Sequence, residues 1–494
     1  NGISISAGEI SSTGGTVSIS ISTSLKGGAI SISSGTFALG GEFTKSGGNL
    51  DLNDVTLSLL SDLQWSSDSL LDISFLALND KALILSDQFS DLKIVNPLSL
   101  DHPNEKLISG DADIEISASV TIGDGELSSN GGEVIFEEGI HLDGGKLEIL
   151  NSILKIGVHF NKTVGTVLLN GTTLGLLSDL SITSDSLLSI GSLELNESSL
   201  TLESDDTDLA IEQLLLLDDP NQKLISGTAD VDLKKGVDIS AGEISSASGT
   251  FSINGSSIFS GGMISLASGT FALGGDFTKN GGTLLLEDIT LSLLSDLQWT
   301  CNSLLEINQL ELNNLALTLG NESSDLKINN PLILDQINEK LISGAADLEL
   351  NELLSISNGE LSSSGGEIRL NNGLDISGGK VEFLNSSLLI GSELGSQVSL
   401  IQSGGSLLAD TSSLQLIQNL ILQSIEGFSF QSLDLNSREL SLASETSSLS
   451  LKEKLIFDLI SEKIDTGSAD LRLEGGIQMS SGEISSSGGA IALS

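Results

Sequence analysis

One phrase returns along this chain at a nearly fixed spacing, and that regularity limits what the chain can fold into. Gly-Glu-(Ile/Leu)-Ser-Ser begins at Gly8, Gly125, Gly242, Gly359 and Gly482, so the first three spacings are 117 residues and the last is 123. A compact domain accepts loop insertions at little cost. A solenoid holds the length of each coil because every coil must stack on the next. The spacing therefore predicts a solenoid.

A second phrase keeps the same spacing and defines the modules. Asn-(Glu/Gln)-Lys-Leu-Ile-Ser-Gly begins at Asn104, Asn221 and Asn338. We expect one continuous solenoid over residues 1–494, and the six extra residues of the last full module fall between Gly359 and Leu414. The predicted modules are 8–124, 125–241, 242–358 and 359–481, with a partial fifth module at 482–494.

Within a module, short stretches alternate apolar and polar residues, as in Val17-Ser-Ile-Ser-Ile and Ala29-Ile-Ser-Ile-Ser. This alternation is typical of a strand with one buried face, and the Gly-Gly and Asn-Gly pairs between strands indicate turns. Because these turns recur about every 20 residues, a module is predicted to hold about six coils. The predicted fold class is all-β, a parallel β-solenoid of about 25 coils, and the coil size favours a right-handed one.

The charge of the chain excludes several classes of function. There are 67 acidic residues against 21 basic ones, and the net charge is −46. Nucleic-acid binding requires basic side chains to neutralise phosphates, so nucleic acid is not an expected partner, and anionic lipid is excluded for the same reason. No apolar run is long enough for a membrane helix. An acidic surface of this kind attracts cations.

The recurrent acidic residues are the candidates for a repeated site. Calcium or another divalent cation prefers carboxylate oxygens, whereas the simpler alternative is a solvated turn residue beside glycine. The candidate cation ligands are Glu9, Glu126, Glu243, Glu360 and Glu483. No other cofactor is expected. Asp205, Asp206 and Asp208 form a denser acidic cluster that the sequence does not repeat.

Other recurrent residues have simpler interpretations. Lys106, Lys223, Lys340 and Lys463 are predicted to form local charge pairs in this acidic chain. Trp65 and its copy Trp299 are predicted to be core aromatics, although an exposed tryptophan is also a platform for a sugar ring.

The sequence gives little sign of catalysis. His141 and His159 are 18 residues apart, close to one coil, but they lack a third ligand at a spacing typical of zinc. His102 and the single cysteine, Cys301, have no copies. Polysaccharide-cleaving sites need clustered carboxylates or a basic residue with calcium, and here the acids are spread evenly. We therefore predict that the chain is not an enzyme.

Some short motifs resemble known surface proteins. Gly281-Gly-Thr-Leu-Leu-Leu resembles the passenger regions of bacterial autotransporters and filamentous-haemagglutinin-like adhesins. The chlamydial polymorphic membrane proteins carry Gly-Gly-Ala-Ile, as at Gly27 and Gly488 here, and Phe-x-x-Asn, as at Phe251 and Phe277. The resemblance implies export, exposure at the cell surface and adhesion.

These features lead to one expected function and two alternatives. We expect a structural extracellular or cell-surface repeat protein, a rigid rod or a filament or surface-layer subunit, that associates with its own copies end to end or laterally. It is expected to be a segment of a longer chain or a protomer that stacks end to end. The first alternative is an adhesin that binds a host glycan or protein, and the second is a polysaccharide-active enzyme.

Overall fold

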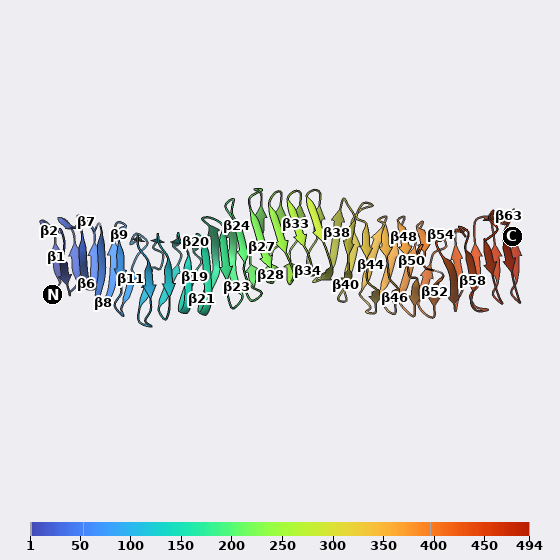
Figure 1. Cartoon of the computed structure of the whole chain (residues 1–494), viewed down its shortest axis with the longest axis horizontal. Coiled ribbons are helices and arrows are strands. Elements are labelled where there is room, and N and C mark those ends of the chain that lie inside the picture. The colour runs from blue at the N-terminus through green and yellow to red at the C-terminus, as the bar shows by residue number, and fades with distance from the viewer. Residues whose placement is uncertain (1, 53, 396, 494) are drawn as a thin grey trace. The chain divides into compact units, whose positions relative to one another are not determined.

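The computed structural model describes residues 2–52, 54–395 and 397–493. These residues form an all-β parallel β-solenoid of about 24 turns of about 20 residues, which confirms the predicted fold class (Figure 1). The chain divides into two compact units. Unit 1 comprises Asn1–Phe251 with Gly262–Ser265, and unit 2 comprises Ser252–Gly261 with Leu266–Ser494.

In unit 1, three strands make one turn, and each strand pairs in parallel with the strand one turn later. The strands therefore form three columns, although the long strands β19 and β21 contribute to more than one column. The first turns contain β1 (Ile3–Ile5), β2 (Glu9–Ser12), β3 (Thr16–Ile19), β4 (Thr23–Leu25), β5 (Ala29–Ile32), β6 (Gly35–Lys45), β7 (Asn49–Asp51), β8 (Val55–Ser67) and β10 (Phe75–Ala77).

The three columns then continue along unit 1. The first contains β11 (Ala82–Leu85), β14 (Lys106–Ile108), β17 (Glu126–Asn130), β19 (Ile140–Leu150), β21 (His159–Leu176), β23 (Leu188–Glu194), β25 (Leu209–Ile211) and β28 (Val231–Leu233). The second contains β9 (Leu71–Ile73), β12 (Leu92–Ile94), β15 (Ile114–Ile116), β18 (Glu133–Phe136), β20 (Ile153–Ile156) and β21. The third contains β13 (Leu98–Leu100), β16 (Val120–Ile122), β19, β21, β22 (Leu180–Thr183), β24 (Ser199–Leu202), β27 (Lys223–Gly227) and β30 (Glu243–Ser246). Between β25 and β30 lie β26 (Leu215–Leu217) and β29 (Val237–Ile239), which pair with each other.

Unit 2 has the same construction. One column contains β32 (Ser257–Phe259), β35 (Phe277–Lys279), β38 (Leu297–Cys301), β41 (Ala316–Leu319), β44 (Lys340–Gly344), β47 (Glu360–Ser363), β50 (Lys380–Phe383) and β53 (Ser406–Leu408). A second contains β39 (Leu305–Ile307), β42 (Leu326–Ile328), β45 (Leu348–Leu350), β48 (Glu367–Leu370), β51 (Ser387–Ile390), β54 (Ser413–Leu416) and β57 (Ser432–Asp434). A third contains β43 (Leu332–Leu334), β46 (Leu354–Ile356), β49 (Leu374–Ile376), β52 (Gln397–Gln402), β55 (Asn419–Ser424), β58 (Glu439–Leu442), β61 (Lys463–Asp465) and β64 (Glu483–Ser485).

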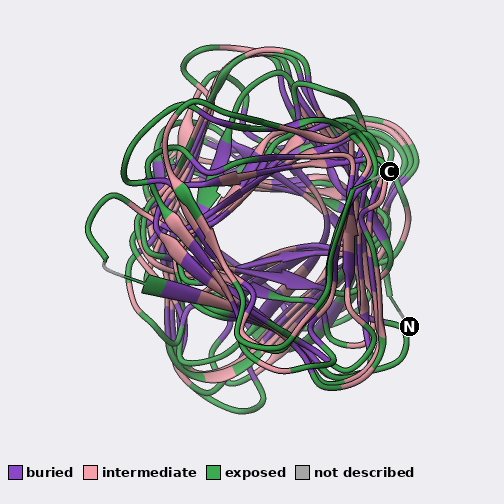
Figure 2. Cartoon of the chain, turned by 90° about the vertical axis from the view of Figure 1, so that its right-hand side faces the viewer, coloured by how far each residue is buried: buried purple, intermediate pink, exposed green. Residues whose placement is uncertain are grey.

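The alternating sequence pattern explains the core of each unit. In β12, β15 and β18 the inward positions place Leu92, Ile114 and Val134 in register on successive turns, and each side chain is almost fully buried. Buried residues line the inner sides of the strands, and exposed residues occupy the outer loops (Figure 2). Burial of one such side chain contributes about 1.5–3 kcal/mol, so these aliphatic columns are the main stabilising feature.

Turn length departs from 20 residues at defined places. The Asn-Glu-Lys phrase lies in a longer turn, where the bond from Asn104 to Asp80 spans 24 residues. The bond from Ser386 to Ser412 spans 26 residues. This longest turn holds the fully exposed Leu394. The six extra residues of the last full module therefore lie between β51 and β54, within the predicted interval.

The glycine of the repeated Gly-Glu phrase is required by a close approach of two turns. A Cβ atom on Gly125 would lie 2.6 Å from the carbonyl oxygen of Glu105, and one on Gly359 would lie 2.7 Å from that of Glu339. Gly242 has the same relation to Gln222, at 2.6 Å. Because any side chain would collide with the preceding turn, only glycine fits this position.

A module is not a whole number of turns. Five successive pairings lead from β14 to β25 through β17, β19, β21 and β23. The copy of β14 is β27, two strands further along the chain, and β27 belongs to the column of β22 and β24. A module therefore spans five turns and two strands, which agrees with the predicted count of about six coils. Corresponding residues of adjacent modules in unit 1 consequently lie on different faces.

Acidic side chains and amides also join successive turns. Asp62 Oδ1 accepts a hydrogen bond from the backbone N–H of Ala82, at 3.0 Å. The same bond recurs at Asp179, Asp296 and Asn419. Many of the acidic residues thus act within the stack, where each satisfies a backbone donor of the next turn.

Unit 2 contains an amide ladder that the modules do not repeat. Asn329 donates to Asn308 at 3.4 Å, Asn351 donates to Asn329 at 2.6 Å, and Asn371 donates to Asn351 at 2.7 Å. A side-chain amide both donates and accepts, so each asparagine in the middle bonds the turn before it and the turn after it. This ladder links four successive turns.

Candidate functional site

The first candidate site is the ion-pair group around Glu126, which lies between lysines on the two neighbouring turns. Lys106 Nζ lies 2.7 Å from Glu126 Oε2, Lys146 Nζ lies 3.3 Å from Oε1, and Lys146 also contacts Glu148 at 2.6 Å. The hydrogen bond from Lys106 is the main cause that holds the pKa of Glu126 below its ordinary 4.5, against the effect of burial. The hydrogen bond to Glu148 chiefly raises the pKa of Lys146.

The other predicted lysine pairs are also present, with one change of partner. Glu360 lies 3.1 Å from both Lys340 and Lys380. Lys223 contacts Glu243 at 3.0 Å. Lys463 is in register with Glu483, but its ion pair at 3.5 Å is with Glu439 on the preceding turn. The predicted local charge pairs are therefore confirmed.

The five candidate cation ligands have unlike surroundings. Glu126 and Glu360 each bind two lysines, Glu243 binds one, and Glu9 has Ala29 as its neighbour on the next turn. A carboxylate neutralised by lysine is a weak ligand for a cation. The described part of the chain contains no group of three His, Cys, Asp or Glu that could hold a metal ion. Cation binding at these positions stays a prediction.

The histidines and the aspartate cluster do not assemble a site of that kind either. His141 and His159 lie on β19 and β21, on adjacent turns, but their register neighbours are Asn161 and Ser181.

In the aspartate cluster, Asp208 accepts a hydrogen bond from the backbone N–H of Asp230 at 3.0 Å. The same bond occurs at Asp91 and Asp325. The prediction that this cluster does not recur is therefore wrong for Asp208, because it has a repeated structural role.

Both tryptophans are core residues, as predicted. Trp65 and Trp299 are fully buried. Phe43 stacks on Trp65 with 4.2 Å between ring centroids, and Phe277 stacks on Trp299 at 4.6 Å. Each aromatic pair fills the interior across two turns, so neither indole is a platform for a sugar.

The structure reveals a repeated polar corner that the sequence analysis missed. Lys45, Lys162 and Lys279 occupy inward positions, two residues after Phe43, Phe160 and Phe277, and each is less than 10% exposed. In the last full module the corresponding residue is Gln402, also buried. We call these positions the lysine corners. The recurring Phe-(Thr/Asn)-Lys triplet is the sequence pattern that could have indicated these positions.

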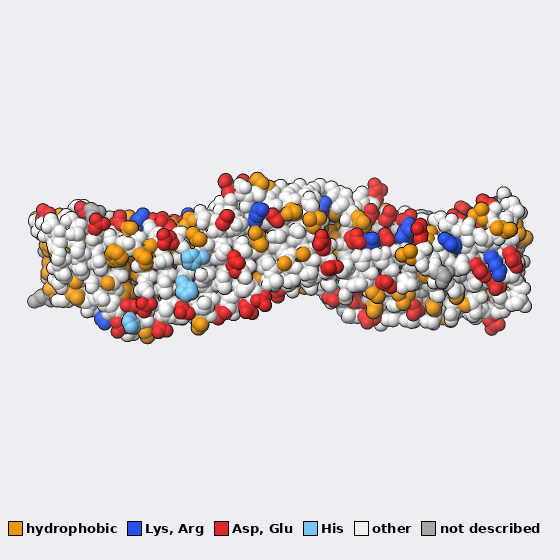
Figure 3. Space-filling view, in the orientation of Figure 1, with side chains coloured by type: hydrophobic (Ala, Val, Ile, Leu, Met, Phe, Trp, Pro, Cys, Tyr) orange, Lys and Arg blue, Asp and Glu red, His pale blue; other side chains and the backbone are white. Residues whose placement is uncertain are grey.

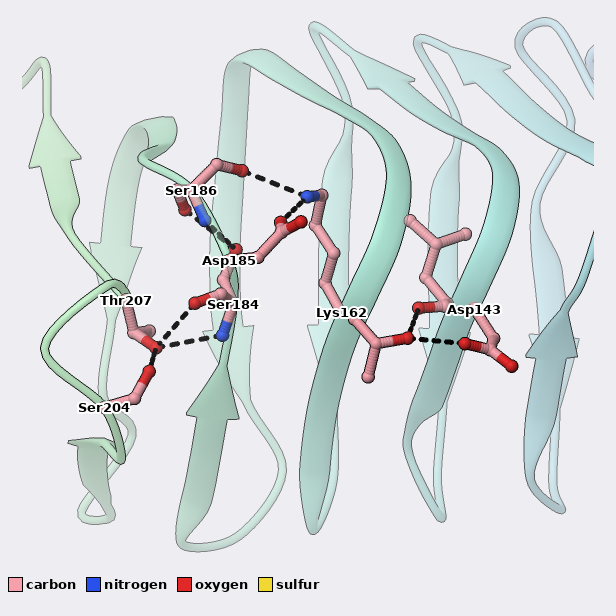
Figure 4. A network of polar contacts seen from close by, with 9 residues as sticks. Asp143, Lys162, Ser184, Asp185, Ser186, Ser204 and Thr207 are labelled. Atoms are coloured by element: carbon pink, nitrogen blue, oxygen red, sulfur yellow. Dashed lines mark hydrogen bonds and ion pairs between the residues drawn. The ribbon is translucent and has the colours of Figure 1, made fainter.

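Figure 4 shows the lysine corner at Lys162. The ammonium group donates to the carboxylate of Asp185 and, at 3.0 Å, to Ser186 Oγ. The hydrogen bond from Lys162 is the main cause that lowers the pKa of Asp185. One turn further on, the backbone N–H of Ser184 donates to Thr207 Oγ1 at 2.9 Å, and that hydroxyl donates to the carbonyl of Ser184 at 3.1 Å. The buried ammonium group of Lys162 is thus paired with a carboxylate and hydrogen-bonded to a hydroxyl.

The single cysteine belongs to the same repeated corner. Cys301 is in register with Lys279, and its backbone N–H donates to Ser324 Oγ at 2.9 Å. The corresponding bonds in other modules are made by Ser67, Ser184 and Ser424. Cys301 is a free, buried thiol that replaces a serine of the repeat.

A second repeated polar group clamps the long turn of each module. Glu105 is only 8% exposed, and its Oε2 accepts from the backbone N–H groups of Asp101 and His102, at 2.8 and 3.2 Å. Gln222 makes the corresponding two bonds with its amide oxygen. The same clamp recurs at Glu339 and Glu462. An acceptor oxygen, not a negative charge, is what this turn requires.

No family model, curated protein or solved structure matches this chain. The likeness to autotransporter passengers, filamentous-haemagglutinin-like adhesins and chlamydial polymorphic membrane proteins therefore stops at the β-solenoid architecture. The described part of the chain contains no helix with the length and apolar character that spanning a membrane requires.

The lysine corners have limited chemistry of their own. A lysine beside a serine hydroxyl is an acid–base pair when the amine is neutral. At Lys162, however, the ammonium group is paired with the Asp185 carboxylate, and an ammonium group has no lone pair with which to accept a proton. Lys45 has the same partner type in Asp68. Lys279 differs, because its oxygen neighbours are Asn302 Oδ1 at 3.2 Å and Ser303 Oγ at 3.4 Å.

Proposed function

We propose that this chain is a structural extracellular or cell-surface repeat protein, a rigid spacer or a subunit of a filament or surface layer. The observation that carries the proposal is the use of the recurrent polar side chains. The Glu126 ion pairs, the Asp62 bonds and the Glu105 clamp each join groups within the solenoid stack. A chain whose repeated polar groups bind its own turns is built for stiffness.

The surface charge bears on how copies associate. Acidic side chains are scattered over the visible face with few basic ones between them (Figure 3). At a net charge of −46, copies repel one another unless salt or divalent ions screen the charge. We therefore propose self-association, end to end or lateral, that depends on ionic strength.

Electron microscopy of negatively stained, purified chain tests this proposal. Samples in calcium, in magnesium and in chelator are compared at equal ionic strength. Unbranched fibres in all three support self-association by screening alone, and fibres lost only in chelator support specific cation bridges. Discrete single particles in every sample, at both low and high salt, contradict the self-associating subunit.

A second candidate function, an adhesin for a glycan or protein, rests on two exposed aromatic residues. Phe89 is 60% exposed and Phe75 is 46% exposed. Neither is repeated, because the corresponding residues one module later are Asp206 and Ser192. Exposed aromatic side chains are common contact residues in binding surfaces. Binding to a glycan array that is lost in F75A/F89A would favour the adhesin, and unchanged or absent binding would count against it.

A further inference from the structure

Lys279 is a buried cation that lacks the carboxylate partner of its copies. It is 6% exposed, and none of the ion pairs in the described part of the chain includes it, whereas Lys45 pairs with Asp68 and Lys162 with Asp185. The residue in the place of those aspartates is Asn302. An unpaired buried ammonium is costly, so conversion of Asn302 to aspartate would supply the missing partner.

We propose that Asn302 is a self-modifying residue, converted to aspartate by deamidation that Lys279 promotes. The backbone nitrogen of Ser303 attacks Cγ of Asn302, loses its proton and forms a five-membered imide. The bond from Cγ to Nδ2 breaks, and ammonia leaves. Water then opens the imide, at Cγ to give aspartate or at the backbone carbonyl to give isoaspartate. The net reaction consumes one water and releases one ammonia, with no other reactant.

Three features of the site favour this reaction. Asn302 and Ser303 are both exposed, so water reaches them, and the small serine side chain leaves the attacking nitrogen accessible. Lys279 Nζ donates to Asn302 Oδ1 at 3.2 Å. That oxygen gains negative charge when the backbone nitrogen adds to Cγ, and a fixed charged donor stabilises such an oxyanion. The aspartate product then forms the ion pair seen at Lys45 and Lys162.

The chain supplies internal controls for the test. Asn151, Asn385 and Asn436 are also exposed and also followed by serine. The side chains of Asn151 and Asn436 donate to Asn130 Oδ1 and to the carbonyl of Leu416. No lysine bonds any of the three in the part of the chain that the structure describes.

The experiment incubates the purified, folded chain in mildly alkaline buffer and follows each asparagine by peptide mass spectrometry. We expect Asn302 to deamidate about tenfold faster than the three control asparagines, a small part of the roughly 100- to 1,000-fold effect of one oxyanion donor in enzymes. We also expect aspartate to exceed isoaspartate at Asn302. In K279Q the Asn302 rate should fall to that of the controls. Glutamine is a matched choice, because Gln402 occupies this corner in the last full module.

Several results would overturn the proposal. One is a rate at Asn302 equal to or below the control rates in the folded chain. Another is an unchanged Asn302 rate in K279Q. A third is loss of ammonia with an amide bond between Lys279 and Asn302. If K279Q fails to fold, the wild-type chain in denaturant gives the same information, because unfolding must remove the advantage of Asn302.

Discussion

Lys279 donates to Asn302 at 3.2 Å in the place where Lys45, two modules earlier, donates to Asp68. One corner is an ion pair and the other pairs a cation with a neutral amide.

The two tryptophans allow the stability of each unit to be measured separately. The fully buried Trp65 lies in unit 1 and the fully buried Trp299 lies in unit 2. Tryptophan fluorescence in W299F or W65F backgrounds therefore reports the unfolding of one unit at a time.

Exchange of these two partners should change stability in opposite directions. We expect D68N to lower, and N302D to raise, the free energy of unfolding of its own unit by about 1 kcal/mol, because Asp68 is half exposed and screened. Urea unfolding read from the tryptophan of the same unit measures both changes. If neither variant changed the urea midpoint of its unit relative to wild type, the ion pair would contribute nothing to stability.

The clamp at Glu105 should depend on an acceptor oxygen and not on charge. E105A leaves the backbone N–H groups of Asp101 and His102 without an acceptor, which we expect to cost about 2–3 kcal/mol in unit 1. E105Q should cost less than half as much, since Gln222 makes the same bonds. The reciprocal variant Q222E is the control, and equal losses in E105A and E105Q would contradict this interpretation.

The single cysteine should be replaceable by serine. We expect C301S to change the free energy of unfolding of unit 2 by no more than about 0.5 kcal/mol, because Ser67, Ser184 and Ser424 occupy this position in the other modules. In the wild-type chain the buried thiol should react with a thiol reagent only after unfolding. Rapid labelling of the folded chain, or a large loss in C301S, would show that the thiol has a separate role.

Acid should selectively remove the contribution of Glu126. Folding lowers the pKa of Glu126, chiefly through the hydrogen bond from Lys106. The resulting stabilisation is complete above the ordinary pKa of 4.5 and is lost as the pH falls through the lowered pKa. We expect E126Q to be less stable than wild type by roughly 1 kcal/mol at neutral pH, and the two chains to converge in acid. Urea midpoints from pH 3 to pH 8, read from Trp65, test this, and a constant difference would contradict it.

The fold was predictable because apolar and polar residues alternate along the strands and the module length is nearly constant, at 117 residues in three modules and 123 in the last full one. The aliphatic columns, such as Leu92, Ile114 and Val134, follow directly from that alternation. Lys106 with Glu126 and the buried Trp65 were also predictable, because scarce cations pair with acids and a lone aromatic belongs in an apolar interior. The count of about six coils in a module was also predictable, but only the strand pairing shows that a module ends one strand short of six turns.

The rest needed the three-dimensional arrangement. Lys45, Lys162 and Lys279 escaped notice because a lysine side chain is normally solvated, and only the stacking of the turns shows that these positions point inward. The ladder from Asn308 to Asn371 is not repeated in other modules, so periodicity gave no indication of it. The aspartate bonds such as Asp62 to Ala82 depend on which backbone donors meet them on the next turn.

The one strand by which a module falls short of six turns has a consequence for inheritance. Each turn is stabilised by its immediate neighbours, so a gene that gains or loses one module still encodes a chain that stacks without a fault. Everything beyond the change, however, is rotated by one third of a circle. If the chain serves only as a rigid scaffold, this rotation has no effect on its function. If corresponding residues must stay on one face, only a gain or loss of three modules at a time keeps that face aligned.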